Sequence, residues 1–300
     1  MGRTIAQLFV DGISMGIVYV LMGAGFNLVM SVEKILFLPF AQFYMLGAYL
    51  AWYFMVPLKI ESAPAWANYL IAVVIAVVGV GILGALVYRL TFRWVQYKEG
   101  QFLTTMLMGV AWMLIITQVA LKLFGTESRG IPTVFPGTWR PWGVNISVEK
   151  VVVIVAGVVV LLALHLVLQK TRMGRAMRAV AFHPDVAALQ GVNSNRVFTL
   201  TMAYGCALAA LAGALLAPVF AVTTEVGNYA FLVPLVVLLG GLGSMLGAIL
   251  AGLIFGMALS YGQYFIGGGE AQIAFFVVVA IVLMLRPGGI LGKSSGDIPL

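Results

Sequence analysis

The stretch that decides the fold runs from Val226 to Gly269 and reads VGNYAFLVPLVVLLGGLGSMLGAILAGLIFGMALSYGQYFIGGG. It contains no Asp, Glu, Lys or Arg. A helix crosses the hydrocarbon core of a membrane with about 20 residues, so this stretch is too long for one crossing. Gly240, Gly241 and Gly243 mark the expected break near 240–244. A short apolar piece precedes this break, and a longer helix from Ser244 to Phe265 follows it.

Similar runs fill the rest of the chain, of which 62% is hydrophobic and only 9% charged. Soluble domains are about one quarter charged, so this composition indicates a membrane protein. We predict an all-α, polytopic membrane protein with eight or nine crossings, in a single transmembrane domain over 1–300. Pro39 interrupts the second run, which predicts a re-entrant or broken helix near 36–42. The other uncharged runs are 35–56, 65–88, 102–121, 151–169 and 197–224.

The formal net charge of +7 comes from basic residues that cluster between apolar runs, as the positive-inside rule requires, and does not indicate nucleic acid binding. The segment 170–196 and the loop with Arg89 and Arg93 are therefore predicted to lie on the same, cytoplasmic side. The segment 125–150, with its prolines and tryptophans, is predicted to be an external loop. The side of the N-terminus stays open, because Arg3 favours the inside and nine crossings favour the outside.

Motifs for catalysis lack their structural context. Gly12 to Gly16 matches the nucleophile pattern G-x-S-x-G around Ser14, but the pattern lies inside an apolar helix instead of a strand, turn and helix. No H-E-x-x-H, metal-ligand cluster or complete G-x-x-x-x-G-K-[ST] phosphate motif is present. We therefore expect no enzyme activity, no metal and no cofactor. Cys206, the single cysteine, is interpreted as a packing residue.

Two further patterns concern packing and energy supply. Small residues recur at helix-packing spacing in the pairs 12/16, 243/247 and 252/256, which we interpret as contacts within the chain, with a partner-subunit interface as the alternative. Ionisable residues are almost absent from the centres of the predicted spans. A carrier driven by protons or sodium needs such residues, so their scarcity suggests that energy reaches this chain from elsewhere.

The segment from Thr171 to Arg196 reads TRMGRAMRAVAFHPDVAALQGVNSNR. Its second part predicts a short helix, because Pro184 is tolerated in a first helical turn and Gly191 is a typical helix stop. An ordinary cytoplasmic loop accounts for the arginines. It does not account for the apolar group of Val186, Ala187 and Leu189, which suggests docking into another protein.

Several segments of the sequence resemble a known family. TRMGRAMRAVA (171–181) and AALQGVNSNRV (187–197) resemble the cytoplasmic loop of branched-chain amino-acid ABC importer permeases, in particular the shorter of their two permease subunits. FYMLGAY (43–49), LLGGLGSMLGA (238–248) and RPGGILG (286–292) are similar to other segments of that family. The similarity extends over nearly the whole chain.

The resemblance implies a coupling helix that fits a groove in an ATPase subunit, and residues 185–191 also fit the looser E-A-A-x-x-x-G pattern of ABC permeases. It implies these ATPase-coupling residues: Arg175, Arg178, Phe182, His183, Pro184, Asp185, Val186, Ala187, Ala188, Leu189 and Gly191. It also implies a second permease subunit, two cytoplasmic ATPase subunits that bind the ATP, a periplasmic substrate-binding protein and a location in the bacterial inner membrane.

Two segments depart from the family pattern. Where members commonly have Asn-Phe-Ala-His-Gly, residues 37–41 read Phe-Leu-Pro-Phe-Ala, which favours a more apolar or aromatic substrate if this segment lines the path. Phe182 and His183 replace residues that are usually acidic or amide, so the ATPase contact is also expected to differ. The polar residues proposed for the substrate path are Asn27, Gln42, Tyr44 and Gln118, with packing between helices as the alternative.

These features give two hypotheses from the sequence. The first is a permease subunit of an ABC importer that moves branched-chain or related hydrophobic or aromatic amino acids, or similar small molecules, inward. The alternative is a stand-alone secondary transporter of small hydrophobic solutes. Dependence on ATPase subunits distinguishes them.

Overall fold

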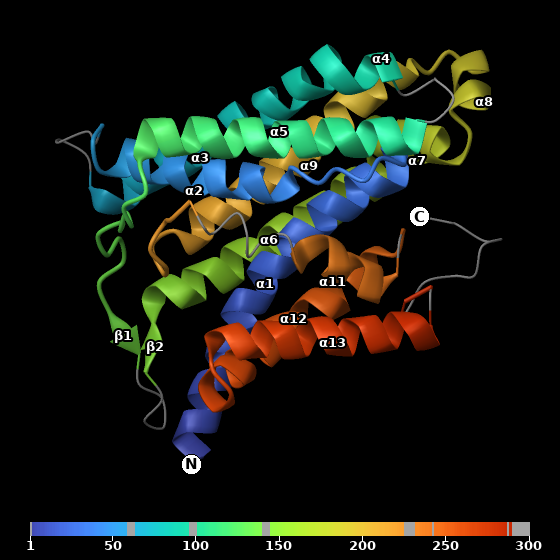
Figure 1. Cartoon of the computed structure of the whole chain (residues 1–300). Coiled ribbons are helices and arrows are strands. Elements are labelled where there is room, and N and C mark those ends of the chain that lie inside the picture. The colour runs from blue at the N-terminus through green and yellow to red at the C-terminus, as the bar shows by residue number, and fades with distance from the viewer. Residues whose placement is uncertain are drawn as a thin grey trace.

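Long apolar helices run roughly side by side through the computed structural model, which describes residues 2–58, 64–95, 101–139, 145–224, 232–241, 243–286 and 288–289 (Figure 1). A two-stranded antiparallel hairpin joins Thr138–Trp139 to Ile146–Ser147. The elements are α1 (Gly2–Glu33), α2 (Phe40–Met55), α3 (Ala65–Val87), the π-helix η1 (Tyr88–Phe92), α4 (Arg93–Val95), α5 (Gln101–Phe124), β1 (Thr138–Trp139), β2 (Ile146–Ser147), α6 (Val148–Lys170), α7 (Arg172–Phe182), α8 (Pro184–Leu189), α9 (Ser194–Leu216), α11 (Leu232–Gly240), α12 (Met245–Phe265) and α13 (Gly268–Leu285).

Seven helical runs within the described ranges are long and apolar enough to cross a membrane, which confirms the all-α, multi-pass prediction. They are α1, the continuous run from α3 to α4, α5, α6, α9, α12 and α13. Helices α2, with 16 residues, and α11, with 9 residues, are shorter. The seven runs with α2 would give eight crossings, and α11 would add a ninth, so the count stays a prediction.

The two predicted breaks are present. Residues 34–37 have no regular structure, a turn follows at 38–39, and α2 begins at Phe40, so the helix is broken near Pro39 and no re-entrant helix forms there. Helix α11 ends at Gly240, and α12 begins at Met245. Gly241 has φ 100° and Gly243 has φ 82°, values that favour glycine because a side chain would clash with the backbone there. Glycine therefore permits the reversal between α11 and α12.

The glycines of α1 and α12 pack these two helices against each other, and the α1–α12 pair has the most extensive contact in the molecule. A methyl group added to Gly12 would lie 3.0 Å from the Cα atom of Met257, and one added to Gly256 would meet the backbone of Gly16. Gly252 is in similar contact with Val20 of α1. For the pairs 12/16 and 252/256, the interpretation as packing within the chain is confirmed.

Helix α9 lies at the centre of the other half, in contact with α1, α2 and α3. Cys206 of α9 is fully buried, and its sulfur lies where a side chain at Gly84 of α3 would stand. This contact confirms the packing role predicted for the cysteine. The hydroxyl of Tyr69 in α3 donates a hydrogen bond to the carbonyl oxygen of Ala214 at 3.0 Å.

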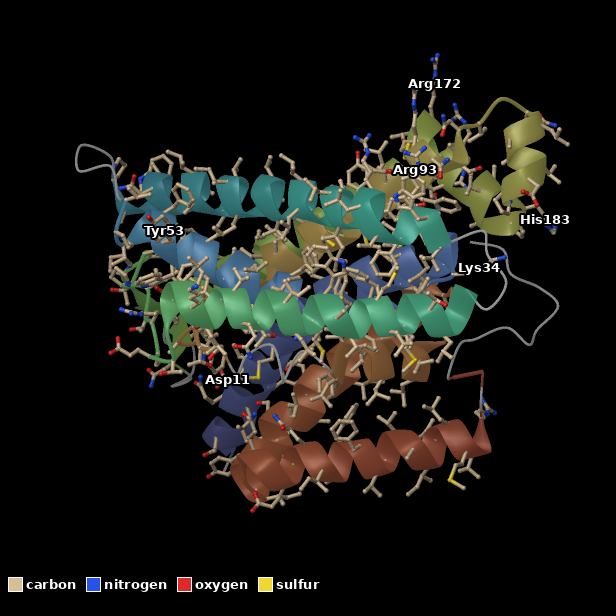
Figure 2. The ribbon with its side chains drawn as sticks, turned by 45° about the horizontal axis from the view of Figure 1, so that its top comes forward. Asp11, Lys34, Tyr53, Arg93, Arg172 and His183 are labelled. Carbon is tan, nitrogen blue, oxygen red and sulfur yellow. The ribbon has the colours of Figure 1, made fainter. Side chains whose placement is uncertain are left out.

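The molecule has two ends that differ in composition. Lys34, Arg93, Arg172 and His183 gather at one end, together with α4, α7 and α8, and we call this the basic end (Figure 2). The strands β1 and β2 lie at the other end, which we call the loop end (Figure 1). Helix α1 begins toward the loop end and reaches the basic end near Lys34. The two basic segments therefore lie at the same end, as the charge pattern predicts.

Candidate functional site

Helices α7 and α8 form a segment that projects from the basic end, and we call residues 171–191 the basic-end segment (Figure 1). The Thr171 hydroxyl caps α7 by accepting a hydrogen bond from the backbone nitrogen of Gly174 at 3.1 Å. The guanidinium of Arg178 donates to the carbonyl oxygen of Leu168, at the end of α6. These contacts tie α7 to the membrane-spanning helix that precedes it.

The second helix of the basic-end segment is also fixed at both ends. Pro184 opens α8, and Gly191 follows its end with φ 81°. The hydroxyl of Ser194 in α9 donates to the carbonyl oxygen of Pro184 at 3.2 Å. Helix α8 is thus held between α7 and α9, as the proline and glycine signals predict.

An apolar surface on this segment is exposed. Leu189 is 89% exposed, Val186 is 54% exposed and Phe182 is 48% exposed. Ala187, by contrast, is buried and packs against the core of the protein. Such side chains at an aqueous end of a membrane protein are typical of a contact surface for another protein.

The other predicted coupling residues lie on the same segment. Arg175, His183, Asp185, Ala188 and Gly191 are exposed, and Pro184 and Arg178 are partly buried. The structure therefore brings the whole predicted group together on one projection, where the arginines flank the apolar surface.

The four residues predicted for the substrate path lie in different surroundings. Asn27 and Gln42 are buried, and Gln118 is exposed on α5 and does not line the cavities described below. The Asn27 Oδ1 atom accepts a hydrogen bond from the backbone nitrogen of Gly243 at 2.9 Å. Asn27 therefore holds the glycine-rich turn against α1. Tyr44 lines a cavity.

This larger cavity has a volume of about 520 Å³, within the range of about 300–1,000 Å³ that is typical of small-molecule sites. Its walls are mostly apolar and come from α1, α2, α9, α12, α13 and the segment after α9. The ring of Tyr19 is fixed against Phe255 of α12, with the two ring centroids 4.5 Å apart. The polar side chains in the lining are Tyr19, Tyr44, Thr223, Gln263 and Gln272.

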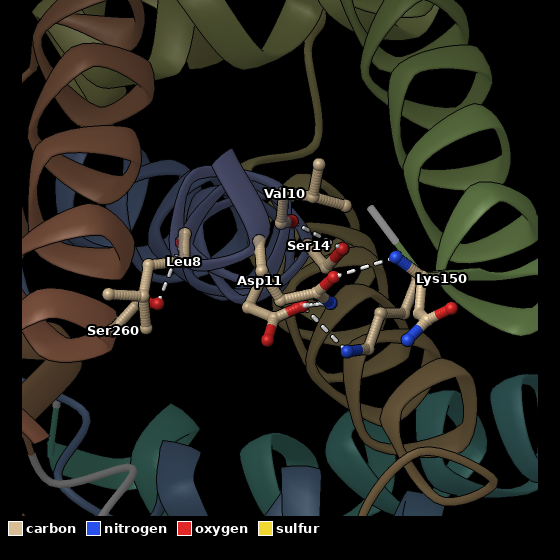
Figure 3. A network of polar contacts seen from close by, with 8 residues as sticks. Leu8, Val10, Asp11, Ser14, Lys150 and Ser260 are labelled. Atoms are coloured by element: carbon tan, nitrogen blue, oxygen red, sulfur yellow. Dashed lines mark hydrogen bonds and ion pairs between the residues drawn. The ribbon is translucent and has the colours of Figure 1, made fainter. Parts of the chain in front are cut away.

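A smaller cavity of about 420 Å³ adjoins the larger one, because Met15, Leu216, Phe220 and Gln263 line both. Its remaining lining includes Asp11 of α1 and Lys150 of α6, among the side chains in Figure 3. In the sequence, Asp11 directly precedes Gly12 of the small-residue pair 12/16. No local signal pairs it with Lys150, because the two are far apart in the chain.

The loop between α5 and β1 contacts the segment that follows α9, beside the larger cavity. Arg129 and Val222 form an isolated antiparallel bridge, in which each backbone nitrogen donates to the other residue's carbonyl oxygen at 2.9 and 2.7 Å. The guanidinium of Arg129 also lies over the ring of Trp52, 5.1 Å from its centroid. Val222 lines the larger cavity, so the loop between α5 and β1 is joined directly to the cavity wall.

The described residues contain a nucleophile pattern outside its usual context and no metal-binding group. Ser14 lies within α1, where its hydroxyl donates to the carbonyl oxygen of Val10 at 2.9 Å, so the nucleophile pattern lacks its strand and turn. Among the described residues, no group of three His, Cys, Asp or Glu side chains could hold a metal ion. Gly292, Lys293 and Ser294 match the end of a phosphate-binding motif, but Pro287 replaces its first glycine; these four lie outside the described residues.

Comparison with known proteins gives a consistent result over almost the whole chain. Residues 8–286 match the family described as "Branched-chain amino acid transport system / permease component". The high-affinity branched-chain amino acid transport system permease protein BraD of Pseudomonas aeruginosa is 28% identical over 300 residues, which cover 96% of this chain and 95% of that protein. The permease protein LivH of the corresponding Escherichia coli system is 27% identical over 304 residues, with the same coverage.

Two further matches are shorter or more distant. A probable branched-chain amino acid transport permease protein LivH of Methanocaldococcus jannaschii is 27% identical over 143 residues, or 45% of each chain. The solved structure of PsaBC from Streptococcus pneumoniae in complex with Fab aligns with a TM-score of 0.45 and 14% identity, and the alignment covers 92% of this chain and 94% of that one.

Proposed function

The chain belongs to the family of branched-chain amino acid transport permease components, and from this premise we propose that it is the membrane-spanning permease subunit of an ATP-driven importer. Its substrates are branched-chain or related hydrophobic or aromatic amino acids. The resemblance found in the sequence and the family match both name branched-chain amino acids, and the aromatic or more apolar alternatives are proposed from residues 37–41. The proposal adds the direction of transport, the energy source and the partners.

The observation that carries the proposal is the exposed apolar surface of the basic-end segment. The side chains of Phe182, Val186 and Leu189 project from a short, capped helical segment. A protein partner that covers these side chains would remove apolar surface from water. The loss of conformational entropy on binding would be small, because α7 and α8 are already held in place. In this proposal the partner is a cytoplasmic ATPase, which moves the membrane helices through α8 and α7.

The charge distribution supports one orientation in the membrane. Basic residues favour the cytoplasmic side, so the basic end is assigned to the cytoplasm. The loop end then faces the periplasm of a bacterial inner membrane, where a substrate-binding protein would dock. Because α1 begins toward the loop end, this orientation places the start of α1 outside, as nine crossings require.

The complete importer requires other subunits. A second permease subunit, two ATPase subunits and a binding protein are its proposed partners, and ATP is bound by the ATPases. No complete phosphate-binding motif occurs in this sequence, which supports the assignment of ATP hydrolysis to partners.

The test is transport of leucine into vesicles that contain this chain and its purified partner subunits. We expect uptake that requires both ATP on the basic-end side and the ATPase subunits, and that stops when either is omitted. Uptake that persists without ATPase subunits and follows a proton or sodium gradient would instead establish the secondary transporter. Copurification of the ATPases with the permease provides an independent check.

A further inference from the structure

The smaller cavity places one carboxylate and one ammonium group beside an apolar space. Lys150 Nζ lies 2.6 Å from Asp11 Oδ1, and the side chains of Lys150 and Asp11 are 23% and 29% exposed (Figure 3). Both groups line the smaller cavity. The adjoining larger cavity is mostly apolar. A polar site of both charges thus adjoins an apolar one.

Neither charged group has used its full capacity for hydrogen bonds. Both contacts of the Asp11 carboxylate in the described part of the chain fall on Oδ1, one from Lys150 and one from Gln7 Nε2 at 3.3 Å. The second oxygen, Oδ2, can still accept. An ammonium group has three donors, and Lys150 directs one to Asp11, so two others can still donate.

The free acceptor on Asp11 and the free donors on Lys150 match the two charged groups of an amino acid. An ammonium group is recognised by a carboxylate oxygen, and a carboxylate by ammonium donors, in charge-assisted hydrogen bonds that are stronger than neutral ones. An amino acid can supply both groups without separating Asp11 from Lys150. Its side chain would then extend past Met15 and Phe220 into the larger cavity.

We propose that Asp11 and Lys150 form a binding site for the head group of a zwitterionic amino acid, whose apolar side chain occupies the larger cavity. This inference rests on the proposed function and assigns the substrate a first position within the permease. The site lies at the loop end, the side from which an imported substrate arrives. Gln263, which lines both cavities, marks the boundary between head group and side chain.

A purely structural role for the ion pair gives different expectations. The pair joins α1 to α6, but a partly exposed pair contributes little to stability. Neutralising either residue should therefore leave the fold intact, and a structural role would affect all ligands equally. A head-group site predicts that neutralising Asp11 affects recognition of the ligand's ammonium group. Neutralising Lys150 should affect recognition of its carboxylate.

The test measures binding to the purified permease–ATPase complex without the binding protein. The probes are leucine, isopentylamine, which lacks the carboxylate, and 4-methylpentanoate, which lacks the ammonium group. The wild-type complex should bind leucine at least about tenfold more tightly than either analogue, the effect of losing one charge-assisted hydrogen bond. Asp11→Asn should remove the preference over 4-methylpentanoate, and Lys150→Met the preference over isopentylamine.

Controls separate the possible outcomes. Lys122→Met removes an exposed charge from the outer end of α5, away from both cavities, and should change no preference. Exchange of the two residues, Asp11→Lys with Lys150→Asp, keeps an ion pair but reverses its direction. It should preserve the melting temperature of the complex and still weaken leucine binding.

Equal binding of all three probes by the wild-type complex, or preferences that neither variant changes, would overturn the head-group site. In that case ATP-driven leucine uptake by the same complex would show that the proposed function still holds. Failure of wild-type uptake would refute the proposed function itself. Restoration of full leucine affinity by the exchanged pair would support a structural role and would also overturn the inference.

Discussion

Helices α7 and α8 are neighbours in the chain, whereas the walls of the larger cavity come from α1, α2, α9, α12 and α13. The first region is held by caps and turns that a short stretch of sequence contains. The second exists only because distant helices pack closely, at glycines such as Gly16 and Gly256. The contact surface for a partner and the space for a substrate thus depend on different physical interactions. Mutations should therefore separate the two.

The largest expected effect is at the glycine contact between α1 and α12. Gly256→Val should prevent close packing, because its side chain would meet the backbone of Gly16, and we expect a loss of about 3 kcal/mol in stability. The larger cavity should be lost, since its walls would separate, whereas the caps that hold α7 and α8 are local and should persist. Thermal unfolding in detergent measures this.

The matched control for that substitution is Gly79→Ala in α3. A methyl group at Gly79 has only the side chain of Leu50 within reach, at 4.0 Å. Its melting temperature should stay close to that of the wild type. A stable Gly256→Val variant with an intact cavity would contradict the packing account.

The second effect should be confined to the basic-end segment. Leu189→Asp should leave stability unchanged because Leu189 is 89% exposed. It should weaken binding of the ATPase by about 2 kcal/mol, the contribution of one buried leucine. Quantitative pull-down of the ATPase measures the loss, with Gln190→Ala, at the adjacent exposed position, as the control. Equal loss in both variants would show that the apolar surface is not the contact.

A third change tests how the glycine-rich turn is held. Asn27→Ala removes the acceptor for the backbone nitrogen of Gly243, so we expect a loss of about 1–2 kcal/mol. Hydrogen exchange should increase at 243–247 and remain unchanged in α7 and α8. Faster exchange in α7 and α8 would indicate that the glycine-rich turn is coupled to the basic-end segment. That result would contradict the separation of the two regions.

The smallest effect should come from the cap of α7. Thr171→Ala removes the hydroxyl that accepts from the Gly174 nitrogen, at a cost of about 1 kcal/mol. Hydrogen exchange in the first turn of α7 should increase, and Thr171→Ser should retain protection. Unchanged exchange in the alanine variant would mean that the contact of Arg178 with α6 is sufficient to hold this turn.

The difference between the regions also explains what the sequence could predict. Pro184, Gly191 and the glycines near 241 act within a few residues, so the position of α8 and the break before α12 could be predicted. The pairing of Asp11 with Lys150 could not, because it depends on how α1 and α6 meet. For the same reason, the polar residues proposed for the path proved to lie in unrelated places, and only Tyr44 lines the cavity.

The glycine pairs are an intermediate case. Their spacing indicates which faces of a helix come close to another helix, but spacing alone does not identify the partner. Only the structure shows that the faces of Gly12 and Gly16 meet those of Gly252 and Gly256. Contacts of this kind bring together cavity residues from both ends of the chain.

The central claim is that an ATPase holds this permease at the exposed tip of α8, and crosslinking tests it most directly. A photoreactive amino acid would replace Leu189 in the assembled complex, with a second sample labelled at Leu123, which is 71% exposed near the far end of α5. We predict a covalent product with the ATPase from position 189 and none from position 123. A complex that is active in transport but gives no ATPase product from position 189 would contradict the account.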